Sequence, residues 1–151
     1  MSAIGRLFFD TNVYIVGAID EGSDESKILR WSGWGNERDE QKVEVIISSE
    51  LIAQILRVAK RLRNKDWAGD LVMRVWSDLN THYVLLDTED SESSPEFESI
   101  PREDVMIYLT AKLGETQVFV SANHALVRAL LQRIGEFECL TPAEFVKKYV
   151  P

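Results

Sequence analysis

Three acidic residues and one amide stand at points of the chain where metal-ion chemistry could be done. Asp10 and Glu50 each follow a short apolar run, and Asp104 begins an apolar helical stretch. Asn123 comes just after another apolar run. Oxygen ligands without an accompanying His or Cys favour Mg²⁺ or Mn²⁺. Such an ion lowers the pKa of a bound water and polarises a phosphoryl oxygen, so the chemistry indicated is phosphate-ester hydrolysis.

Whether these side chains meet depends on the elements that carry them. Short apolar runs rich in β-branched or large residues are typical of strands buried on both faces of a parallel sheet. We predict such strands at residues 7–9, 43–47, 82–86, 117–121 and about 137–140, with helices between them, including one at about 125–134. This alternation predicts a single α/β domain over residues 1–151, with a mainly parallel sheet.

The carboxyl ends of parallel strands meet at one edge of a sheet, where ligands bind in open α/β folds. Asp10, Glu50 and Asp104 are therefore expected to converge there, and their mutual repulsion would be relieved by a cation. A structural role is the alternative for each residue alone. A strand-end Asp can cap a turn, and acids in a first helical turn are favoured by the helix dipole.

A predicted amphipathic helix after Glu50 carries a basic face. Its apolar positions recur at helical spacing, and its other face and the residues that follow are positively charged: Arg57, Lys60, Arg61, Arg63 and Lys65. A solvated surface is one interpretation. A phosphate-contacting or partner-contacting patch is the other, and the clustering favours it in so acidic a chain.

The totals exclude some classes of protein. The chain has 151 residues, 45% of them apolar, and a net charge of −8. That charge argues against a protein that coats nucleic acid by bulk charge, although not against an enzyme with a local basic patch. No apolar run has the ~20 residues of a membrane span, and no signal-peptide pattern opens the chain, so a cytoplasmic protein is expected. Cys139 is expected to be a core residue.

The segments FFDTNVYI, SSELIAQIL, PREDVMIYLTAKL, VFVSANHAL and LTPAEFV together resemble a PIN domain along nearly the whole chain. This resemblance implies a three-layer α/β/α sandwich with metal-dependent ribonuclease activity. Members of this family often act as VapC-type toxins paired with a cognate antitoxin. The strand followed by Asp-Thr-Asn is a weak motif alone, whereas the stretch from Asp104 to Ala111, with the strand and polar turn after it, is more specific.

The resemblance also implies roles for individual residues. Asp10, Glu50 and Asp104 would be acidic metal ligands. Three further residues would support the site, namely Thr11 and Asn12 beside the first carboxylate and Ser121 on the fourth strand. Asn123 departs from the pattern, because many members carry Asp there. An amide oxygen can still bind Mg²⁺, but the site has one negative charge fewer.

Two main hypotheses follow. The first is a Mg²⁺- or Mn²⁺-dependent endoribonuclease that holds RNA on Arg57, Lys60 and Arg61, with an antitoxin and a second copy of the chain as further partners. The second is a PIN-like RNA- or protein-binding module without nuclease activity, motivated by Asn123. A phosphatase with a strand-end aspartate is a weaker third, because such enzymes need a second Asp where this chain has Asn12.

Overall fold

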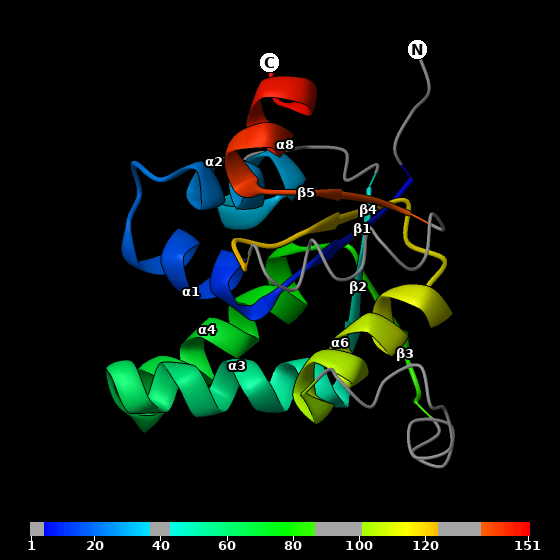
Figure 1. The fold of residues 1–151 in the computed structure, drawn as a ribbon. Coiled ribbons are helices and arrows are strands. Elements are labelled where there is room, and N and C mark those ends of the chain that lie inside the picture. Colours follow the sequence, from blue (N-terminus) through cyan, green and yellow to red (C-terminus); the bar gives the residue numbers. More distant parts are fainter. Residues whose placement is uncertain (1–4, 37–42, 87–100, 124–136) are drawn as a thin grey trace.

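The computed structural model describes residues 5–36, 43–86, 101–123 and 137–151 (Figure 1). The strands in these ranges are β1 (Arg6–Phe9), β2 (Glu44–Ser48), β3 (Thr81–Val84), β4 (Val118–Val120) and β5 (Glu138–Leu140). The helices are α1 (Thr11–Ile19), α2 (Asp24–Ser32), the 3₁₀ helix η1 (Trp34–Asn36), α3 (Ser49–Leu62), α4 (Lys65–Asp78), α6 (Arg102–Leu113) and α8 (Pro142–Tyr149). The helix expected at 125–134 lies outside the described residues.

The five strands form one sheet in the order β3-β2-β1-β4-β5, and every pairing is parallel. The central strand β1 pairs with β2 through Leu7 and Val45, and with β4 through Phe8 and Phe119. Residues 7–9 are fully buried, as a strand covered on both faces requires. The prediction of an α/β fold with a parallel sheet is confirmed.

Helices cover both faces of this sheet. On one face, the rings of Phe8 and Phe119 stack with their centroids 5.0 Å apart. The Phe119 ring also stacks on Phe137, which in turn contacts Tyr108 of α6. Neighbouring residues of a strand point to opposite faces. Phe9 therefore lies on the other face, where its ring contacts Tyr14 of α1. The chain thus has the three layers expected of an α/β/α sandwich.

Local signals in the sequence explain where several helices begin. Asp10 caps α1, and the Ser48 side chain accepts a hydrogen bond from the Leu51 amide at the start of α3. Thr141 and Glu144 form the capping box expected at the start of α8. Asp10 directly follows β1 and Ser48 is the last residue of β2, so each helix leaves the carboxyl edge of the sheet.

Cys139 is buried, as expected. Burial, together with the nearby charge of Glu138, raises the pKa of its thiol to about 11. The thiol is therefore protonated and unreactive near neutral pH. Among the described helices, none has both the length and the apolar character needed to cross a membrane.

Candidate active site

The strand order reverses beside β1, and this defines the place where a ligand site is expected. From β1 the chain adds β2 and β3 on one side, and it then returns to place β4 and β5 on the other side. In open α/β sheets, ligands bind at the carboxyl ends of the strands that flank such a switch point. Asp10 directly follows β1 and Ser121 directly follows β4, so both lie at this position.

Asp10 is held in one orientation by hydrogen bonds to both carboxylate oxygens. Its Oδ1 accepts a hydrogen bond of 2.8 Å from the Thr11 amide, and its Oδ2 accepts one of 2.7 Å from the Ser121 hydroxyl. The Ser121 Oγ in turn accepts a hydrogen bond of 3.0 Å from the backbone N–H of Asn123. Ser121 is fully buried, and Asp10 is only 7% exposed. The carboxylate is therefore preordered, and one of its two hydrogen bonds comes from Ser121, the residue to which the resemblance gave a supporting role.

Asp104 lies in the first turn of α6, and its ionisation is affected by the negative charge of Asp10. Its pKa is raised by partial burial, then by the negative charge of Asp10, and then by that of Glu103. Burial likewise raises the pKa of Asp10, although its hydrogen bonds from Ser121 and Thr11 act in the opposite direction. Two carboxylates that disfavour each other's charge are a good fit for a hard divalent cation, which would neutralise both.

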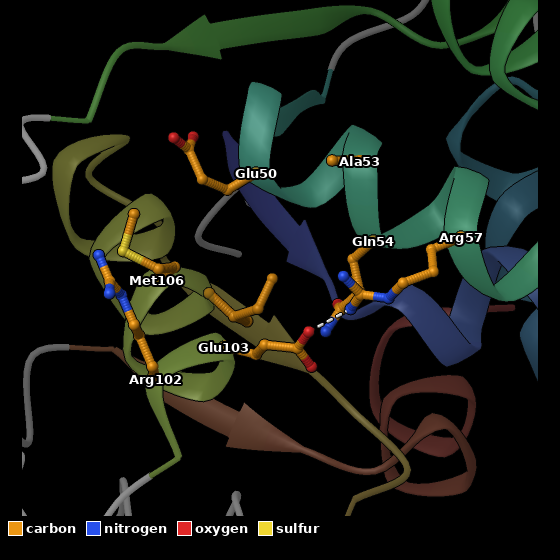
Figure 2. A pocket seen from close by; sticks show the side chains of 8 residues that line it. Glu50, Ala53, Gln54, Arg57, Arg102, Glu103 and Met106 are labelled. Atoms are coloured by element: carbon orange, nitrogen blue, oxygen red, sulfur yellow. Dashed lines mark hydrogen bonds and ion pairs between the residues drawn. The ribbon is translucent and has the colours of Figure 1, made fainter.

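Glu50 does not join this carboxylate pair. Within the described ranges, no three Asp, Glu, His or Cys side chains lie together as a group that could hold a metal ion. Glu50 occupies the first turn of α3, and Figure 2 shows its carboxylate pointing away from Gln54 and Arg57. The structure thus couples the charges of Asp10 and Asp104, and it places Glu50 among the residues that line a pocket between α3 and α6.

The residues next to Asp10 differ in their placement. The backbone of Thr11 contacts Asp10, whereas its buried hydroxyl donates to the Oε1 of Gln54 on α3. Asn12 is exposed at the start of α1. Sequence reasoning missed Gln54. The only sequence signal was its position four residues after Glu50, which places both on the same face of α3.

A groove between α3 and α6 opens beside this site. It has a volume of about 270 Å³, and its walls include Glu50, Gln54 and Arg57 from α3 and Arg102, Glu103 and Met106 from α6. An ion pair between Arg57 and Glu103 joins the two walls (Figure 2).

The three residues predicted to contact RNA are all exposed on α3, namely Arg57, Lys60 and Arg61. Arg57 takes part in the ion pair with Glu103 and lines the groove. Lys60 and Arg61 lie in the last turn of the helix, farther along the chain from Glu50. The structure therefore brings one of the three to the groove.

Comparison with known proteins supports the fold. No protein-family model matches the chain, and no curated protein matches it. Its structure is similar to a chain in the crystal structure of VapBC2 from Rickettsia felis bound to a DNA fragment from their promoter. The TM-score is 0.63 at 15% sequence identity, over 90% of this chain and 98% of that chain. The fold is PIN-like. At this identity the likeness concerns the fold, and the chemistry has to be argued from the residues of this chain.

Proposed function

We propose that this protein is a metal-dependent endoribonuclease that hydrolyses phosphodiester bonds of RNA. The observation that carries the proposal is the buried Asp10, fixed by Ser121 and the Thr11 amide and electrostatically coupled to Asp104 at the switch point of the sheet. The PIN-like fold supports the same activity. A preordered pair of carboxylates can hold a divalent cation at a fixed position. The cation can then polarise a phosphoryl oxygen and activate a water molecule there.

Individual residues of the chain have distinct roles in this proposal. Asp10 and Asp104 would hold Mg²⁺ or Mn²⁺, and Asn123 would add an amide oxygen. Ser121 and the Thr11 amide keep the Asp10 carboxylate oriented, as residues behind a metal ligand do. Glu50 stays a proposed third ligand. The chemistry that such an ion supplies is a lowered pKa of water and a polarised phosphoryl oxygen.

We extend the proposal to substrate and partners. Arg57, Lys60 and Arg61 on α3 would contact RNA phosphates, because the rest of the chain is acidic and this face is locally basic. The structurally similar chain comes from a VapBC2 complex, which supports a role as the toxin of a toxin–antitoxin pair with a cognate antitoxin as partner. A homodimer is a further proposed assembly. Such an enzyme would meet its RNA in the cytoplasm.

The test is the substitution Asp10→Asn, assayed on a fluorophore-quencher single-stranded RNA with Mn²⁺. Loss of a metal ligand removes several kcal/mol of transition-state stabilisation, so we expect cleavage to fall at least about 100-fold. Asp20→Asn is the matched control, because Asp20 is an exposed residue at the other end of the same helix. Equal turnover by the wild type and Asp10→Asn would reject the mechanism. Glu50→Gln, assayed in the same way, tests the third ligand.

One observation favours a second function, a PIN-like RNA- or protein-binding module without nuclease activity. Asn123 stands where a fourth acid is expected, and within the described ranges no three Asp, Glu, His or Cys side chains form a group that could hold a metal ion. Calorimetry with Mn²⁺ separates the two functions. Absence of binding at millimolar Mn²⁺, with RNA binding retained, would favour the module over the nuclease.

A further inference from the structure

Both walls of the groove between α3 and α6 are linked to residues of the carboxylate pair. On the α3 wall, Gln54 is hydrogen-bonded to Thr11, the residue next to Asp10. On the α6 wall, Glu103 directly precedes Asp104. The volume of about 270 Å³ lies below the ~300 Å³ at which ordinary small-molecule pockets begin. A space this small excludes folded or double-stranded RNA and leaves room for no more than a single nucleotide unit.

The side chain of Gln54 is fixed in a way that leaves its donors available to this groove. Its Oε1 accepts a hydrogen bond from the Thr11 hydroxyl, so the orientation of the amide is set by a buried neighbour. The two N–H groups of the same amide take no part in that bond. An oriented amide with two donors on the wall of a groove can bind acceptor atoms such as phosphate, ribose or base oxygens.

Arg57 supplies a cation that a phosphate could take over. Its side chain is 49% exposed and that of its partner Glu103 is 59% exposed, so water screens the ion pair and makes it weak. Glu103 nevertheless holds the guanidinium across the groove (Figure 2). The planar guanidinium matches the oxygens of a phosphate better than an ammonium does. Because the ion pair is weak, Arg57 can leave Glu103 and bind a phosphate at a small cost in free energy.

We propose that the α3–α6 groove binds the ribonucleotide next to the scissile phosphodiester. The Gln54 amide donates hydrogen bonds to that nucleotide, and Arg57 leaves Glu103 to bind its phosphate. This assignment rests on the proposed ribonuclease function, because it takes the carboxylate pair as the place of cleavage. Gln54 then contacts the substrate, and through Thr11 it also fixes the spacing between the groove and Asp10.

The decisive variant is Gln54→Glu, made in an Asp10→Asn background so that the RNA is not cleaved. Glu retains an acceptor for the Thr11 hydroxyl but lacks both donors. Gln117→Glu is the matched control, because Gln117 accepts a hydrogen bond of 2.9 Å from the Arg6 amide at the amino end of the sheet. Both substitutions add the same charge. Binding of a fluorescein-labelled single-stranded RNA is measured by anisotropy, with thermal melts to confirm folding.

We expect Gln54→Glu to raise the Kd about tenfold or more, the usual effect of losing a hydrogen bond to a charged group. Gln117→Glu should change the Kd less than about twofold, since bulk charge alone acts weakly under screening. Equal effects of the two substitutions would overturn the proposal. So would the absence of RNA binding in the Asp10→Asn background, which would leave a protein partner as the occupant of the groove.

Two further variants test the exchange at Arg57. Glu103→Gln should tighten RNA binding several-fold, because the arginine no longer has a competing carboxylate. Arg57→Ala should weaken it and lower the slope of log K against log salt by about 0.7, the value for one phosphate contact in a single strand. Lys147→Ala removes the same charge from an exposed position in the last turn of α8 and serves as the control. An unchanged affinity in Glu103→Gln would contradict the exchange.

The binding assay keeps this inference separate from the proposed function. If the wild type does not cleave RNA but Gln54→Glu still weakens binding selectively, the nuclease is rejected and the nucleotide groove stands. If the wild type cleaves RNA and Gln54→Glu behaves like Gln117→Glu, the nuclease stands and the groove is rejected.

Discussion

At the scale of single residues, Asp10 combines burial with a charge that the protein only partly compensates. It accepts two hydrogen bonds, yet burial outweighs them and raises its pKa. A carboxylate in this state lowers the stability of the metal-free fold, because removing a charge from water costs free energy. A metal ligand is expected to behave in this way, because its buried charge is compensated only when a cation binds.

We therefore predict that Asp10→Asn stabilises the protein in the presence of EDTA. The amide oxygen can still accept the hydrogen bond from Thr11 and cap α1, since Asn is as good a cap as Asp. A gain of about 1 kcal/mol would raise the melting temperature by about 2–4 °C in a chain of this length. Calorimetry at neutral pH measures it, with Asp20→Asn as control. A lower melting temperature for Asp10→Asn would show that the carboxylate is structural.

At the scale of elements, the position of α6 on the sheet depends on a glycine at its end. A Cβ at Gly114 would lie within 2.9 Å of the Cγ1 of Ile46 on β2, and it would come still closer to the Cγ2 of the same residue. The φ of Gly114 is −76°, so the constraint is steric and not conformational. The carboxyl end of α6, the helix that carries Asp104 in its first turn, therefore packs closely against β2.

We predict that Gly114→Ala destabilises the fold by about 1–3 kcal/mol, the usual effect of overpacking in a tight core. Gly69→Ala is the matched control, because no atom lies within 4 Å of a Cβ at this position inside α4. Alanine favours a helix over glycine, so Gly69→Ala should stabilise by up to about 1 kcal/mol. Urea denaturation of both variants checks the prediction. Two changes of the same sign would contradict it.

A second contact between elements makes the stability depend on pH. The Tyr149 hydroxyl of α8 donates a hydrogen bond of 2.6 Å to Glu138 of β5, and Lys148 also pairs with this carboxylate. The bond from Lys148 and then the bond from Tyr149 hold the pKa of Glu138 below its usual value of 4.5. A depressed pKa contributes stability that is present above the usual value and is lost as the pH falls through the folded-state value.

Tyr149→Phe should therefore melt at a lower temperature than the wild type at pH 7, and the difference should shrink as the pH falls below 4.5. The effect is small, because Glu138 is a third exposed and water screens the interaction. Thermal melts of both proteins from pH 7 to pH 3.5 measure the difference. A gap between the two proteins that stays constant with pH would mean that the hydroxyl acts through packing alone.

At the scale of the whole molecule, the sequence predicted the sheet and the edge where the site lies, because both depend on local patterns. Apolar runs indicate buried strands, and polar residues after them indicate the carboxyl edge, so Asp10 was expected there. The supporting role of Ser121 was implied only by the resemblance to PIN domains. The direction of the Glu50 side chain and the contact of Gln54 with Thr11 were not predictable. The Gln54–Thr11 contact joins residues 43 positions apart in sequence, which local periodicity does not predict.

The net charge of −8 leads to a last prediction for the whole chain. Two salts at the same ionic strength separate general screening of the protein's charge from specific binding of Mg²⁺. Sodium chloride should raise the melting temperature slightly, since it reduces self-repulsion. At matched ionic strength, MgCl₂ should raise it further in the wild type. A free ion concentration ten times the Kd adds about 1.4 kcal/mol, or about 2–4 °C. Asp10→Asn should respond equally to both salts. A similar extra gain from Mg²⁺ in Asp10→Asn would mean that the ion acts on the overall charge and not at the carboxylate pair.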